Sequence, residues 1–229
     1  MKRKMVVVLT ACLFIIATVS VINAFDFPGM KKKDDKAAVD VGSLSNRSAT
    51  VLKCVSSATL ASAEGVVNIQ MALGREEEAE KLQQVINNTK EKKGDKNATK
   101  ALVAEMNNAT ADLETVDLQA NLDKSEASKY IGLSLLNIGA GILLDGIATK
   151  IAADLLKESQ AALKHVSLNT VVQVKDVIDV SQFVVQEVPP QTKNLYNYSV
   201  KLTDYANTNG IPTPSKEDIE KKLKDLQEE

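Results

Sequence analysis

Apolar and small residues recur along much of the chain at alternating spacings of four and three. Between residues 44 and 72 this series comprises Leu44, Ser48, Val51, Val55, Ala58, Ser62, Gly65, Ile69 and Ala72. Similar series occupy residues 102–120 and 131–156. Residues at this spacing lie along one face of an α-helix. The pattern predicts an all-α protein, an elongated antiparallel helical bundle with coiled-coil-like packing around a central small-residue-rich helix at about residues 123–165.

Small residues in the central helix also recur at every seventh position. They are Ser125, Gly132, Gly139, Gly146 and Ala153. Seven residues are close to two helical turns, so these side chains share one face. Each glycine costs a helix about 1 kcal/mol relative to alanine, which close contact with another helix can offset. We therefore expect this series to form a helix-contact groove.

The pattern divides the chain into four parts. Residues 1–24 are expected to be a signal peptide, residues 25–40 a flexible charged tether, and residues 41–188 the helical bundle. Pro189 and Pro190 are expected to stop the preceding element, leaving short amphipathic helices in residues 189–229 as a loosely packed appendage. Residues 171–185 are rich in β-branched side chains, which leaves helix and strand both open, with helix favoured.

The N-terminus has the composition of an export signal. Lys2, Arg3 and Lys4 precede an apolar run at residues 5–21, and Ala24 offers a cleavage site. The run is nearly long enough to be retained as an anchor, and a third alternative is lipidation at Cys12. We expect an exported protein, periplasmic or secreted, or tethered to a membrane through residues 5–24.

Composition and charge restrict the classes of function that we expect for this chain. Hydrophobic residues make up 44% of the chain but aromatic residues only 3%, so small aliphatic side chains must form the core. Removal of residues 1–24 takes away three of the 28 basic residues and none of the 30 acidic ones, giving a net charge of 25 − 30 = −5. An acidic chain without a basic stripe is a poor nucleic-acid binder, so no nucleic-acid partner is expected.

Residues that could support catalysis or hold a metal are sparse. The chain has one histidine, His165, and no nucleophile-elbow pattern around a serine. After removal of the signal, Cys54 is the single cysteine, so we expect a free thiol, either buried or paired with another molecule. No enzyme activity, metal or cofactor is predicted.

Asp145 is the most unusual polar residue because it falls on the apolar seam of the central helix. It could turn toward solvent or bond a neighbour. As a buried polar group it could instead fix the helix register, or act as a switch that is protonated before membrane entry.

Three functions follow from these features. The leading hypothesis is an exported non-catalytic helical protein that acts through protein–protein contacts, as an envelope scaffold or adaptor, with a protein partner or by self-association. The second is a membrane-interacting protein that uses residues 130–149, which broadly resembles the strategy of helical pore-forming toxins. The third is a carrier of an apolar ligand held between helices.

Overall fold

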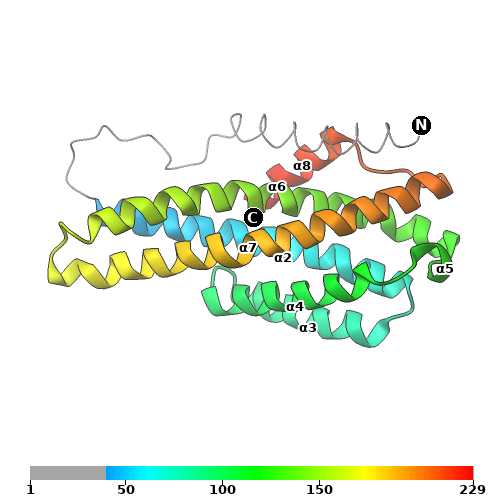
Figure 1. The fold of residues 1–229 in the computed structure, drawn as a ribbon, viewed down its shortest axis with the longest axis horizontal. Helices are drawn as coiled ribbons and strands as arrows, with labels where there is room; N and C mark the ends of the chain where they lie inside the picture. Colours follow the sequence, from blue (N-terminus) through cyan, green and yellow to red (C-terminus); the bar gives the residue numbers. More distant parts are fainter. Residues whose placement is uncertain (1–39, 229) are drawn as a thin grey trace.

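The computed structural model describes residues 40–228, which form seven helices and no strand (Figure 1). The helices are α2 (Val41–Ala72), α3 (Glu76–Glu91), α4 (Lys96–Glu114), α5 (Leu118–Asn121), α6 (Lys124–Ala162), α7 (Leu168–Asn209) and α8 (Lys216–Glu228). This confirms the predicted all-α bundle, including helix rather than strand at residues 171–185. The predicted signal peptide, Cys12 and all but the last residue of the predicted tether lie outside the described residues.

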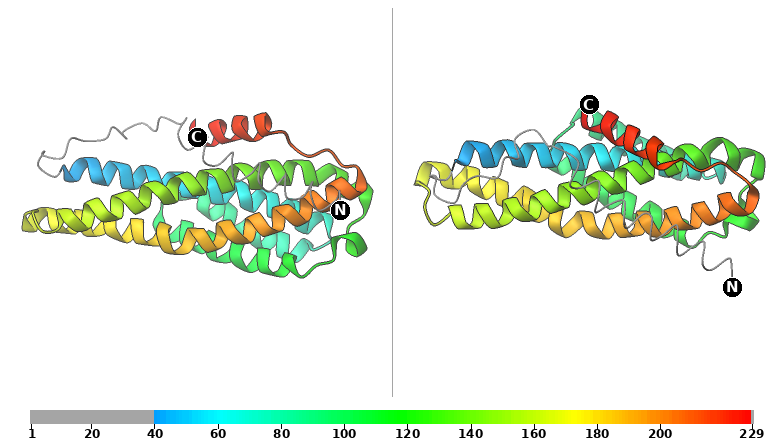
Figure 2. Two further views of the ribbon diagram at one scale, coloured as in Figure 1. Left: turned by 45° about the horizontal axis from the view of Figure 1, so that its top comes forward. Right: turned by 90° about the horizontal axis from the view of Figure 1, so that it is seen from above.

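Three long helices, α2, α6 and α7, run side by side along most of the molecule (Figure 1). The helix α6 runs antiparallel to both α2 and α7, and it packs against each of them. The hairpin of α3 and α4 packs against α2 along one half of the bundle, and α4 also contacts α7. On another side, α8 crosses α6 obliquely (Figure 2). The central helix of the prediction is therefore surrounded by three others.

Local sequence signals explain where several helices begin and end. Asp40 caps α2 by accepting a hydrogen bond from the Ser43 amide at 3.1 Å, and Asp95 caps α4 in the same way. The turn after α2 and the turn after α7 use Gly74 and Gly210, with φ of 69° and 68°. These are left-handed conformations that glycine adopts without a steric penalty.

The expected break at Pro189 and Pro190 does not occur, because both prolines lie inside α7. A proline within a helix removes a backbone hydrogen bond and costs about 3 kcal/mol. Both prolines are exposed, whereas Val188 just before them and Gln191 just after them are buried. Packing on both sides of the pair holds the helix together. The boundary expected between residues 188 and 189 therefore falls within one continuous helix.

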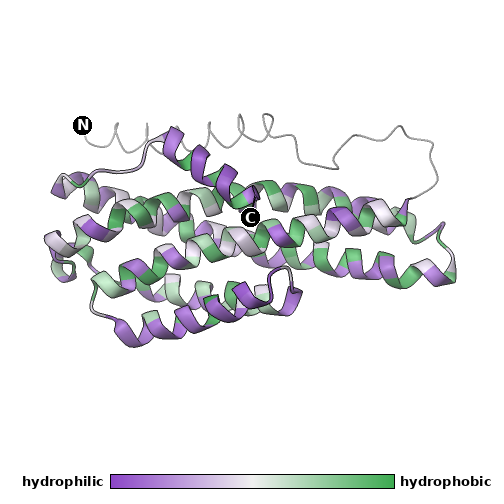
Figure 3. Cartoon of the chain, turned by 180° about the vertical axis from the view of Figure 1, so that it is seen from behind, coloured by the Kyte–Doolittle hydropathy of each residue, from purple (hydrophilic) through white to green (hydrophobic). Residues whose placement is uncertain are grey.

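The core consists of two apolar clusters arranged along the long axis. One gathers the N-terminal half of α2, the C-terminal half of α6, the first part of α7 and all three buried residues of α8. The other gathers the rest of α2, α6 and α7 with α3 and α4. Figure 3 shows the complementary pattern on the outside, where hydrophilic residues cover much of α3. Residues 127–162 of α6 are long and apolar enough to span a membrane, and 78% of their most apolar window is buried in the bundle.

Candidate functional site

The helices α2 and α6 approach each other closely at two glycines. A Cβ atom on Gly141 would overlap the Ser62 hydroxyl and lie 2.7 Å from the carbonyl oxygen of Ala58. A Cβ atom on Gly65 would lie 2.9 Å from Cγ1 of Ile138 and 3.0 Å from the Ser134 carbonyl oxygen. Real Cβ atoms essentially never lie closer than 3.0 Å to such a neighbouring heavy atom, and each of the two positions has at least one contact below that limit. Glycine at these positions lets the two backbones lie almost in contact.

The predicted seven-residue series lies on a different face of α6. A Cβ on Gly139 would meet Cδ1 of Ile219 in α8 at 3.2 Å, and one on Gly132 would lie 3.5 Å from the Pro212 carbonyl oxygen. Gly146 is exposed, and a Cβ there would meet no atom within 4 Å. The ends of the series are Ser125, which is exposed, and Ala153, which is half-buried. Its centre therefore lies beneath α8, not beneath α2.

Asp145 is fully buried where α2, α6 and α7 meet. Neither of its carboxyl oxygens has a hydrogen-bond partner among the described residues. The Thr192 hydroxyl of α7 lies near this carboxyl, but it donates its proton to the Val188 carbonyl at 3.0 Å. Burial therefore raises the pKa of the Asp145 carboxyl well above its ordinary value, and Thr192 lowers it only in part. The neutral acid is the form that this core favours.

Further polar side chains lie near Asp145 and cross between helices. Gln191 of α7 donates to the Thr59 hydroxyl of α2 at 3.3 Å, with both side chains buried. The hydroxyl of Ser62 on α2 and the second amide atom of Gln191, Oε1, have no partner among the described residues. We call Thr59, Ser62, Asp145, Gln191 and Thr192 the polar layer. It lies where the two apolar clusters meet.

The thiol of Cys54 lies on α2 near Asp145 and is half-buried. Burial is the main cause that raises its pKa to about 11, and the ionised form of Asp145 acts in the same direction. A thiol with so high a pKa carries almost no thiolate at neutral pH and is a weak nucleophile. This environment suits a packed apolar group better than a reactive site.

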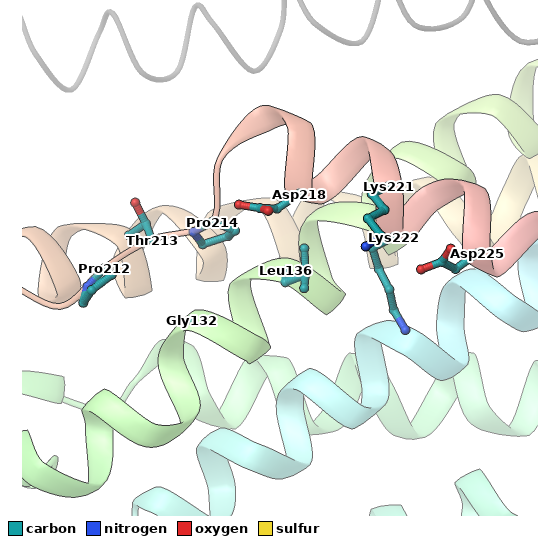
Figure 4. A pocket seen from close by; sticks show the side chains of 9 residues that line it. All are labelled: Gly132, Leu136, Pro212, Thr213, Pro214, Asp218, Lys221, Lys222 and Asp225. Carbon is teal, nitrogen blue, oxygen red and sulfur yellow. The ribbon is translucent and has the colours of Figure 1, made fainter.

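An open pocket of about 470 Å³ lies between α6, the α7–α8 connection and α8 (Figure 4). Gly132 and Leu136 form its α6 side, and Pro212 and Pro214 come from the connection. Charged side chains of α8, among them Lys222, complete the lining. The pocket exists because α8 crosses α6 at an angle and leaves the start of α6 partly uncovered.

The free end of the α6–α7 hairpin exposes apolar side chains. We call residues 163–175 the hairpin tip. Leu168 is 90% exposed and Val172 is 64% exposed, and their spacing of four places them on one face of α7. Leu163 and Val166 pack instead against the adjacent cluster, which holds the connection in place. Within residues 40–228, only Met71 and Leu133 are comparable exposed large apolar residues, and they lie on α2 and α6.

The sequence predicted the position of Asp145 on the seam but not its neighbours on α7, and it did not single out the hairpin tip. Within the part of the chain that the structure describes, no group of three or more His, Cys, Asp or Glu side chains could hold a metal ion.

Comparisons with protein-family models, curated proteins and solved structures found no match to this chain. The class of the protein therefore rests on the fold itself, an elongated bundle of antiparallel helices.

Proposed function

We propose that the protein is an exported, non-catalytic helical scaffold or adaptor whose contact end is the hairpin tip. The observation that carries this proposal is the exposure of Leu168 and Val172 on one face at the end of the bundle. The two side chains are neighbours on one helical face, and contiguous exposed apolar surface marks interaction sites, whereas single exposed apolar residues are normal.

The architecture supports such a role because a long bundle can place one of its ends in contact with a partner. The helix α6 has 39 residues and α7 has 42, which at 1.5 Å per residue makes each about 60 Å long. Close packing at Gly65 and Gly141 joins α2 to the middle of α6. A long, closely packed bundle holds its tip at a defined distance from its other end, which is what a spacer or scaffold requires.

Hydrogen–deuterium exchange tests the contact end directly. The protein would be purified in the form that its cell processes and mixed with the native envelope fraction. We expect amides in residues 163–175 to become protected, and L168S/V172S to lose that protection. The variant M71S/L133S, which removes the other two exposed apolar side chains, should keep it. Protection that is absent from the tip, or that survives in L168S/V172S, would contradict the proposal.

A further inference from the structure

We propose that α7 contains a proton-controlled hinge at the polar layer. With Asp145 neutral, α7 stays packed against α2 and α6; with Asp145 ionised, α7 opens at Pro189 and Pro190 and water reaches the layer. This hinge is separate from the hairpin tip, since it lies where the two apolar clusters meet. A buried acid without a partner and a pair of prolines beside it form its two parts.

Asp145 is the group that gains or loses a proton. Its side chain is fully buried, and both carboxyl oxygens lack a hydrogen-bond partner among the described residues. A neutral carboxyl group is tolerated in such a place at a moderate cost, whereas an ionised one without partners costs far more. Ionisation therefore favours any movement that lets water reach the carboxylate.

The helices around Asp145 offer no charge to compensate an ionised carboxylate. On α2, Cys54 lies near Asp145 and stays neutral, because its pKa is raised to about 11. The charged residues closest to the layer in sequence are all exposed: Lys53 on α2, Lys150 on α6, and Glu187 and Lys193 on α7. The helix α8 packs over Gly139, which lies about 120° around α6 from Asp145. Water is therefore the available source of hydrogen bonds for the ionised form.

Pro189 and Pro190 weaken α7 beside this acid. Neither residue has a backbone N–H, so the carbonyl oxygens of Val185 and Gln186 lose the hydrogen bonds that an unbroken helix would give them. Both prolines are exposed. The helix is thus continuous at this point because of the packing of its neighbours and not because of its own hydrogen bonds.

Few polar contacts hold this part of α7 to the rest of the bundle. The Gln191 amide donates to the Thr59 hydroxyl of α2 at 3.3 Å. The Thr192 hydroxyl lies near Asp145 but donates to the Val188 carbonyl of its own helix at 3.0 Å. Thr192 can donate to an ionised Asp145 only by giving up this bond, which lies next to the two prolines. Ionisation therefore acts on α7 at its weakest point.

The hinge should open as pH rises. Burial raises the pKa of Asp145 well above its ordinary value, so the closed form keeps its proton at a pH where the open, hydrated form releases it. Between the ordinary and the raised pKa, opening becomes about ten-fold more favourable per pH unit, because one proton is released per opening. Above the raised pKa both forms are ionised and the dependence ends.

Amide hydrogen exchange at several pH values tests where the bundle opens. The protein, in the form that its cell processes, would be measured from pH 5 to 8, with each rate corrected for the intrinsic pH dependence of exchange. We expect opening to increase by up to about ten-fold per pH unit at residues 185–196 of α7 and 141–149 of α6. Residues 174–184 of α7 and 98–110 of α4 should respond much less.

Two pairs of variants separate the acid from the prolines. Asp145→Asn should remove the pH dependence at the hinge, whereas Asp154→Asn, at an exposed position of the same helix, should keep it. P189A/P190A restores two backbone donors and should reduce opening at residues 185–196 by roughly ten-fold or more at each pH. Pro212→Ala, at an exposed position in the α7–α8 connection, should leave that opening unchanged.

Three results would overturn the hinge. Opening at residues 185–196 that is independent of pH, or that keeps its dependence in Asp145→Asn, would show that the acid does not control it. An equal response in all helices would show a loss of global stability alone. Equal exchange in P189A/P190A and Pro212→Ala would show that the prolines do not set the opening point. If Asp145→Asn does not fold, the unsubstituted protein and the proline variants still decide, because both the confined pH response and its loss are measured with Asp145 present.

Discussion

The contact between α2 and α6 at Gly141 can be tested with a pair of substitutions on one helix. Gly141→Ala and Gly146→Ala each replace a helical glycine with alanine, which stabilises a helix by up to about 1 kcal/mol. Their surroundings differ. A Cβ at position 146 would meet no atom within 4 Å, whereas one at position 141 would overlap the Ser62 hydroxyl and lie 2.7 Å from the Ala58 carbonyl oxygen.

The size of the destabilisation depends on which atoms around position 141 can move to make room for the new methyl group. Rotation of the Ser62 side chain relieves the hydroxyl overlap but leaves its Cβ 3.3 Å from the new methyl group. The Ala58 carbonyl is part of the α2 backbone and moves only if the two helices separate. Overpacking of this kind costs about 1–3 kcal/mol. Because the helix propensity gain is common to both variants, Gly141→Ala should be less stable than Gly146→Ala by about 1–3 kcal/mol.

Equilibrium urea unfolding followed by helical circular dichroism measures this difference. We expect Gly146→Ala to unfold at a higher urea concentration than the unsubstituted protein, and Gly141→Ala at a lower concentration than Gly146→Ala, with similar slopes. In thermal unfolding the same gap corresponds to about 2–12 °C for a chain of this size. If Gly141→Ala is stabilised as much as Gly146→Ala, the two backbones do not approach each other as described.

Three other predictions concern the core and α8. The folded-state pKa of Asp145 is raised, so above the ordinary aspartate pKa the native state keeps a proton that the unfolded state releases, and the free energy of unfolding falls as pH rises. In urea titrations from pH 5 to 8, Asp145→Asn should remove this dependence, which is at most ~1.4 kcal/mol per pH unit, whereas the control Asp154→Asn should keep it. Cys54, with a pKa of about 11 against an ordinary 9.0, should react with iodoacetamide at pH 8 roughly a hundred-fold more slowly in the folded than in the urea-unfolded protein, and equal rates would exclude a buried thiol. Leu223 is fully buried against the bundle, so Leu223→Ala should weaken the attachment of α8 by about 2–4 kcal/mol. Amide hydrogen exchange should then become faster in α8 alone, and unchanged exchange there would mean that α8 does not depend on this contact.

The periodic pattern predicted the buried faces well because helix geometry alone sets them. The first eight residues of the series that starts at Leu44 are all buried in α2, and only Ala72 at its end is partly exposed. The series that starts at Leu102 is buried to the end of α4 and at Val116 just after it, whereas Ala120, its last member, is exposed. A spacing of 3.6 residues per turn fixes which side chains share a face, whatever they contact.

The partner of each face could not be predicted in the same way. The helix α6 is apolar nearly all round, so its sequence does not show which side meets α2, α7 or α8. Gly141 lies outside the seven-residue phase of Gly132, Gly139 and Gly146, yet it makes the tightest contact. Its partner, Ser62, lies 79 positions away, and one sequence does not reveal such a pairing.

In α7, packing outweighed local preference. The β-branched residues 171–185 and the two following prolines favour a strand or a break, but this segment packs against α2, α4 and α6. Val174, Val177, Val184 and Val188 are buried on one side of the helix. Similar valines surround Leu168 and Val172, so the sequence could not show that these two face outward.

The polar layer has a consequence for the register of the three long helices. Helices lined with alanine, serine and glycine can slide past one another with little change in apolar contact. A slide of α6 by one turn, however, would carry Asp145 away from Thr192 and into one of the apolar clusters, and would move Gly141 off Ser62. A buried polar group with fixed neighbours disfavours such alternatives even where it contributes little stability. Because α6 leads directly into the hairpin tip, the register that the polar layer favours also sets how far Leu168 and Val172 extend beyond the end of α2.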